Sequence, residues 1–135
     1  MNEKVTLRLN GNGEFVSEDG KGCETLNPKE MLLYAAARCA GATILKIMRG
    51  ERLVPVRFEI ACSGELSTET LRTESVFRSF HIAYNIACAT EAEQEKIGRA
   101  VTLAHERYCG LVQMLRKIGP VTHEIAVVTT EPAKA

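Results

Sequence analysis

The chain has 135 residues, 45% of them hydrophobic, and its 17 Lys and Arg residues balance 17 Asp and Glu residues. This length fits one domain, residues 1–135, with a modest apolar core. Because the positive and negative charges cancel, no field of the whole molecule attracts nucleic acid or an anionic membrane, and we expect neither as a partner.

The N-terminal residues, MNEKVTLRL, are charged and lack the apolar core of a signal peptide. The five cysteines are an odd number at irregular spacing, without a Cys-x-x-Cys pair. Such a set is typical neither of a secreted disulfide framework nor of a zinc ribbon. We therefore expect a cytoplasmic protein whose thiols are mostly reduced.

The first predicted element is a hairpin over residues 7–16, LRLNGNGEFV, because its central Gly-Asn-Gly tolerates the positive φ of a tight turn. A polar loop over residues 18–26 follows and leads to a helix.

The helix begins at Asn27, whose side chain can cap it, with Pro28 in the first position and Glu30 as the acidic residue of a capping box. It ends at Gly50. Residues 31–45 carry a single charge, so we expect this helix to be buried on most sides. We expect it to be too short for a bilayer, and it holds an arginine near its middle.

Two strands follow, over residues 54–66 and 79–88, and a polar loop between them predicts a second hairpin. Their apolar residues alternate and predict one buried face: Val56, Phe58, Ile60 and Cys62 on the first strand, and Phe80, Ile82, Tyr84, Ile86 and Cys88 on the second.

Thr90 and Glu93 repeat the capping-box pattern and open a second helix with an apolar stripe that continues to Leu115. Gly110 lowers the helix propensity, so we expect a kink or a restart at Cys109.

The last strand covers residues 122–129, after Gly119 and Pro120 end the helical part. The order of elements predicts an α+β domain, an antiparallel sheet with helices against one face. The alanine-rich first helix is more apolar than a small monomer easily covers, which indicates a homodimer.

Cys39 lies in the middle of the first helix, and its neighbours on the same face, Ala35, Ala36, Ala42 and Thr43, are all small. A substrate or another helix can approach such a face closely, with the sulfur at the floor of a groove. The alternative is that Cys39 packs as a small apolar residue, which is the commoner role of a buried cysteine.

The other cysteines differ in what their positions predict. Cys62 and Cys88 are expected to be packed free thiols, and Cys23 lies in a loop where it is exposed without a designed role. Cys109 starts a helical turn, and the unpaired N–H groups there can favour its thiolate. Alternatively, Cys109 can form a disulfide with another cysteine. Its alternative role is a core contact next to Tyr108.

His105 lies four residues before Cys109, a spacing that suits two metal ligands and also places an imidazole where it can deprotonate the thiol. A zinc site needs two further ligands, and only Cys39, His81 or His123 can supply them. Solvent-exposed or helix-capping roles for these histidines are the more common interpretation.

The helix start at residues 27–33 with its following Cys39, and Arg107-Tyr108-Cys109 followed by Met114-Leu115, resemble the OsmC/Ohr family of thiol-dependent peroxidases. Within this family the likeness is greatest to the YhfA-like branch. The order of elements matches over most of the chain.

The resemblance implies an OsmC-like fold, an intertwined homodimer with a central buried helix and with active sites at the subunit interface. It implies that organic hydroperoxides oxidise Cys39, the peroxidatic thiol, in an oxidative stress response, and that Cys109 is the resolving thiol. A dithiol or a lipoylated protein would reduce the resulting disulfide, without a cofactor or a metal.

The chain departs from the family pattern around the reactive thiol, which peroxidases hold with an arginine of an N-terminal loop and a glutamate of the helix start. Arg8 lies in a predicted strand, Lys29 occupies the place of the glutamate, and Glu30 is displaced by one residue. Arg38 can substitute as the cation, or it forms a salt bridge.

The departures favour a second hypothesis, a non-catalytic binding or redox-sensing protein. A metal site built on His105 and Cys109 is a third hypothesis.

Overall fold

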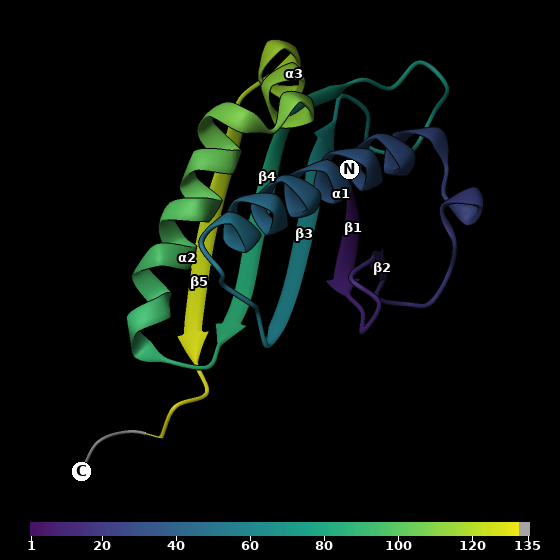
Figure 1. Ribbon diagram of the computed structural model, residues 1–135. Helices are drawn as coiled ribbons and strands as arrows, with labels where there is room; N and C mark the ends of the chain where they lie inside the picture. The colour runs from purple at the N-terminus through teal and green to yellow at the C-terminus, as the bar shows by residue number, and fades with distance from the viewer. Residues whose placement is uncertain (133–135) are drawn as a thin grey trace.

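In the computed structural model, which describes residues 1–132, strands and helices follow one another in the predicted α+β order (Figure 1). The strands are β1 (Asn2–Leu9), β2 (Phe15–Ser17), β3 (Arg57–Leu66), β4 (Phe77–Cys88) and β5 (Val121–Thr129). The helices are α1 (Pro28–Gly50), α2 (Glu91–Leu103) and α3 (Gly110–Ile118), with a 3-10 turn at Cys23–Thr25 and a π-helical turn at Ala104–Tyr108. Residues 133–135, the end of the span expected to form one domain, lie outside the described part.

The described strands form one sheet in the order β2-β1-β3-β4-β5. β1 pairs antiparallel with β2 and β3 pairs antiparallel with β4, so both expected hairpins are confirmed. β5 runs parallel to β4, with Val121 opposite Phe80 and Thr129 opposite Cys88, so the sheet is mixed rather than wholly antiparallel as expected. Parallel neighbours need a long crossover connection, and α2 and α3 supply one because they return the chain to the end where β4 begins.

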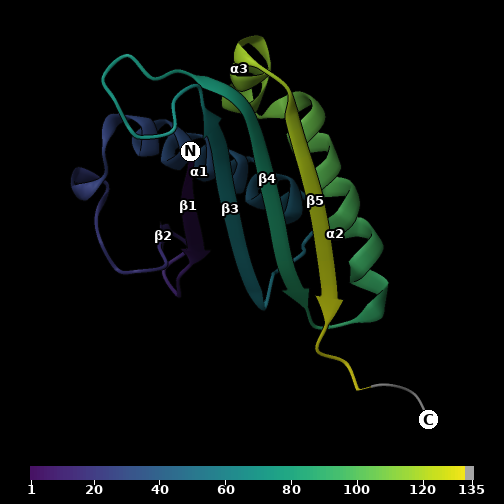
Figure 2. The same ribbon diagram turned by 180° about the vertical axis from the view of Figure 1, so that it is seen from behind.

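The three helices cover one face of the sheet and leave the other face open (Figures 1 and 2). α1 crosses β1 and β3, α2 runs alongside β5, and α3 lies at the end of the sheet where β4 and β5 begin (Figure 1). The core lies between the helices and the sheet. It contains the apolar faces predicted for β3 and β4, except that Val56 precedes β3 and is exposed.

The N-terminus of α1 has the predicted capping box. The side chain of Asn27 accepts hydrogen bonds from the N–H groups of Lys29 and Glu30, each at 2.9 Å, and the Glu30 carboxylate accepts one from the N–H of Asn27 at 3.0 Å. The same pattern at Thr90 differs: within the described chain its side chain caps no backbone N–H and donates to the Glu93 carboxylate at 3.1 Å.

α1 is long and apolar enough to cross a membrane by length and composition, which corrects the expectation that it is too short. Its buried face packs on the sheet, and at Gly41 it meets the Phe15 ring of β2, where an added Cβ would lie 2.5 Å from the ring. Only 44% of its most apolar 18-residue window is buried within this chain, which corrects the expectation that the helix is buried on most sides. The buried residues are Leu33, Ala36, Ala37, Ala40, Gly41, Ile44, Leu45 and Met48.

Candidate active site

Cys39 lies halfway along α1 and is partly exposed. It stands at the edge of the buried face, because Ala36 and Ala40 beside it are buried whereas Arg38 and Ala42 are exposed. Cys39 is therefore partly exposed and also packs against the core. It is not a fully packed cysteine, and the groove predicted around it stays a prediction.

Cys109 is fully buried at the junction between the π-helical turn and α3. Its backbone is extended, with φ −81° and ψ 105°, so the helix breaks here and restarts at Gly110, as predicted. The N–H of Cys109 donates to the carbonyl of Ala104 at 2.8 Å, a bond that spans five residues as in a π-helix. Such π-helical turns within helices occur frequently at functional sites.

The two thiols meet, although 70 residues separate them in the sequence. Burial raises the pKa of Cys109 to about 12, the N–H groups of Val112 and Leu111 at the start of α3 lower it, and the nearby Cys39 thiol raises it further. The helix start therefore does favour the thiolate of Cys109, as predicted, but burial outweighs it. Within residues 1–132 all five cysteines are free thiols.

His105 is fully buried, which corrects the expectation of an exposed or capping histidine. Its Nδ1 lies 2.7 Å from the hydroxyl of Tyr84, and its ring stacks on that of His123 with centroids 4.0 Å apart. Its Nε2 has no hydrogen-bond partner among the described residues. Burial, His123 and Arg116 lower the pKa of His105 to about 4.

These contacts weaken two of the hypotheses on His105. A histidine with a pKa near 4 is a poor base for a thiol with a pKa near 12, and its Nδ1 is already bonded to Tyr84. For a metal site, residues 1–132 contain no group of three or more His, Cys, Asp or Glu side chains placed to hold an ion.

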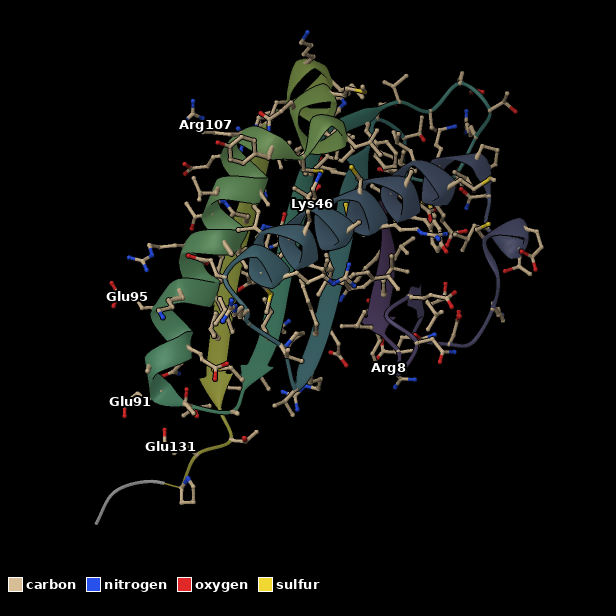
Figure 3. All side chains as sticks on the ribbon, in the orientation of Figure 1. Arg8, Lys46, Glu91, Glu95, Arg107 and Glu131 are labelled. Atoms are coloured by element: carbon tan, nitrogen blue, oxygen red, sulfur yellow. The ribbon has the colours of Figure 1, made fainter. Side chains whose placement is uncertain are left out.

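Of the charged residues proposed to support Cys39, Glu30 and Arg8 lie away from it, whereas Arg38 is its neighbour on α1. Glu30 is bound in the capping box, nine residues before Cys39 and therefore about 13 Å along the helix on the opposite side. Arg8 lies near the end of β1, away from the middle of α1 (Figure 3), and faces away from the buried Leu7. Arg38 is exposed on α1 and makes no ion pair in the described part of the chain.

Lys29, where the resemblance leads us to expect a glutamate, makes contacts with a neighbouring loop. Its ammonium donates to the carbonyls of Arg72 and Thr73 at 3.2 and 3.3 Å and so ties the start of α1 to the loop before β4.

The remaining cysteines have the predicted surroundings. Cys62 is buried on β3, and burial and the nearby Cys109 raise its pKa to about 12. Cys88 is buried and its thiol donates to the carbonyls of Thr90 and Val128 at 3.3 and 3.4 Å. Cys23 is exposed in the 3-10 turn.

The residues that surround the break at Cys109 were not found from the sequence. Arg116 and Gln113 on α3 bind the carbonyl of His105, and Tyr84 approaches from β4. A signal for Arg116 and Gln113 was present, because a break predicted at Cys109 leaves unpaired carbonyls just before it that need donors. Tyr84 carried no such signal, since it fits the apolar face of its strand.

α1 and the junction before α3 thus place a partly exposed thiol near a buried one, beside a single β-sheet. A family model described as OsmC-like protein matches residues 19–124, and the chain belongs to this family. Protein YhfA of Escherichia coli strain K12 is 28% identical over 123 residues, which are 90% of this chain and 89% of that protein.

Solved structures show the same fold. A hypothetical protein from Aquifex aeolicus VF5 superposes with a TM-score of 0.65 at 23% identity, over 97% of this chain and 98% of that one. The organic hydroperoxide resistance protein OhrB of Bacillus subtilis gives a TM-score of 0.55 at 17% identity, over 93% and 97%. The expected OsmC-like fold is therefore confirmed.

Proposed function

We propose that this protein is a thiol-dependent peroxidase that reduces organic hydroperoxides with Cys39 and Cys109 and serves in the response to oxidative stress. The observation that carries the proposal is the proximity of two thiols, one partly exposed and the other fully buried, which is close enough for Cys39 to raise the pKa of Cys109. A peroxide can reach Cys39 first, and the oxidised sulfur then lies beside its partner. The family, which includes hydroperoxide resistance proteins, supports the same chemistry.

The reaction would proceed in three steps. The Cys39 thiolate attacks the peroxide, so that the O–O bond breaks, an S–O bond forms, and the sulfenic acid and an alkoxide result; the alkoxide takes a proton to leave as the alcohol. Cys109 then displaces the hydroxyl of the sulfenic acid, and a disulfide and water form. A dithiol or a lipoylated protein reduces this disulfide and is itself oxidised.

A second candidate function is a non-catalytic one, in which Cys39 senses or traps an oxidant or another electrophile. The observation that favours it is the placement of Glu30, Arg8 and Lys29, none of which stands beside Cys39 within the described chain. In the described chain Arg38 is then the charged residue next to Cys39, and any further activating group would come from another subunit.

We propose that the working form is a homodimer that covers the outer face of α1, where Ala42 and Lys46 are exposed and Lys46 lies on the side away from the sheet (Figure 3). Sedimentation equilibrium is expected to give twice the monomer mass of 14.8 kDa, and Ala42→Glu is expected to shift the protein toward the monomer. A wild-type protein that sediments as a monomer at high concentration contradicts this assembly.

The free thiols fit a reducing compartment, and we propose the cytoplasm as its location. Immunodetection in cell fractions checks this assignment.

The experiment that tests the catalytic proposal treats the reduced wild-type protein with one equivalent of cumene hydroperoxide. Intact mass is expected to fall by two hydrogens, and peptide mapping is expected to join Cys39 to Cys109. With a dithiol in excess, the protein is expected to consume many equivalents of hydroperoxide. A single oxidation without turnover would favour the sensing function, and a disulfide between other cysteines contradicts the assigned pair.

A further inference from the structure

The helix break before Cys109 leaves backbone carbonyls without their helical partners. In a continuous α-helix the carbonyls of His105 and Glu106 would accept from the N–H groups of Cys109 and Gly110. Here the N–H of Cys109 donates to Ala104 instead, and the chain turns into an extended conformation at Cys109. The end of the π-helical turn therefore needs other donors to stay in place.

Arg116, on α3, supplies these donors. Its Nη2 donates to the carbonyl of His105 at 3.1 Å and its Nη1 to that of Glu106 at 3.3 Å. Its Nη1 also lies 3.2 Å from the side-chain oxygen of Gln113, whose amide nitrogen donates to the same His105 carbonyl at 3.0 Å. One guanidinium thus joins the π-helical turn to α3, the two segments between which Cys109 is held.

Arg116, together with Gln113, bridges the two segments to which the backbone of Cys109 is bonded. On one side the N–H of Cys109 is bonded to Ala104 in the π-helical turn, and on the other its carbonyl accepts from the N–H of Gln113 in α3 at 3.2 Å. If the bridge from Arg116 were lost, the two segments could separate or rejoin as a regular helix. Either change would move the sulfur of Cys109 relative to that of Cys39.

We propose that Arg116 is a positioning residue for Cys109, which sets the rate at which this thiol closes the disulfide with Cys39. The inference rests on the proposed function. In the step concerned, the Cys109 sulfur bonds to the Cys39 sulfur, the S–O bond of the sulfenic acid breaks, and the thiol proton leaves with the hydroxyl as water. No group outside the two cysteines is consumed. Such a step is sensitive to geometry, and a displacement of about 1 Å can cost up to a hundredfold in rate.

The test compares Arg116→Met with Lys117→Met, an exposed neighbour on α3 that makes no hydrogen bond through its side chain in the described structure. After one equivalent of cumene hydroperoxide, quenching with a 1,3-dione traps the sulfenic acid for mass analysis. In Arg116→Met the loss of free Cys39 is expected at the wild-type rate, whereas the sulfenic acid should persist at least about tenfold longer. Lys117→Met should match the wild type, and Arg116→Lys should lie between. A wild-type lifetime in Arg116→Met overturns the inference.

A second arm separates this inference from the proposed function. If the wild type does not react with hydroperoxide, the peroxidase proposal fails, and the role of Arg116 is measured in a glutathione redox buffer. There the Cys109 thiol attacks a mixed disulfide of Cys39 with glutathione, releases reduced glutathione and forms the same Cys39–Cys109 bond. Closure is expected to be about tenfold slower in Arg116→Met. Equal closure rates for Arg116→Met and Lys117→Met overturn the inference in this arm too.

Discussion

Replacement of Cys39 by serine is expected to lower hydroperoxide consumption, measured with a dithiol in excess, by about a thousandfold or more, to the background of the dithiol alone. A serine hydroxyl is a far weaker nucleophile than a thiolate, and the loss of a covalent nucleophile removes most of the rate enhancement of an enzyme. Of the two thiols in the proposed pair, Cys39 is the partly exposed one, so we expect it to meet the peroxide. Turnover that survives in Cys39→Ser contradicts the assignment of this residue.

Two further variants separate the roles of the thiols. Cys109→Ser should still react once with hydroperoxide but accumulate the sulfenic acid of Cys39, because the buried partner that displaces the hydroxyl is missing. Cys23→Ser is the matched control, since Cys23 is exposed in the 3-10 turn outside the thiol pair, and it should keep wild-type turnover. A Cys109→Ser protein that forms the wild-type amount of intramolecular disulfide would show that another thiol resolves Cys39.

The free energy of unfolding is expected to fall by about 3 kcal/mol as the pH is lowered from about 6.5 to about 4, through His105 alone. In the unfolded chain this histidine takes up a proton near pH 6.5, whereas in the folded protein its pKa is lowered to about 4. Between these values the unfolded state binds the proton that the folded state does not bind. Stability contributed by neutral His105 is therefore complete above pH 6.5 and lost by pH 4.

The groups that face His105 determine how this prediction is tested. Tyr84 bonds to its Nδ1, His123 stacks on its ring, and the positive charge of Arg116 further disfavours protonation. His105→Gln keeps a polar group near Tyr84 but does not titrate. Urea unfolding at pH 7 and pH 4.5 should show that the wild type loses more free energy of unfolding than His105→Gln. The carboxylates titrate in both proteins, so their contribution to this loss is the same. Parallel losses would show that His105 is not held neutral.

Much of the local structure was predictable because its signals lie within a few residues of one another. Asn27 and Glu30 form the capping box that their spacing predicts, and Gly110 follows the break in the helix. The alternation of Phe58, Ile60 and Cys62 gives β3 its buried face. The family could likewise be recognised from short motifs in order along the chain.

The sequence by itself determined the elements, the fold class and the candidate thiols, whereas the tertiary structure decided how these thiols behave. Whether Cys39 touches Cys109 depends on closing a segment of 70 residues, which no local pattern encodes. Burial raises the pKa of Cys109, although the N–H groups at the start of α3 lower it. Burial also keeps His105 neutral, whereas the sequence predicted a histidine at the surface. Desolvation depends on everything that packs around a group, and therefore only the folded chain determines it.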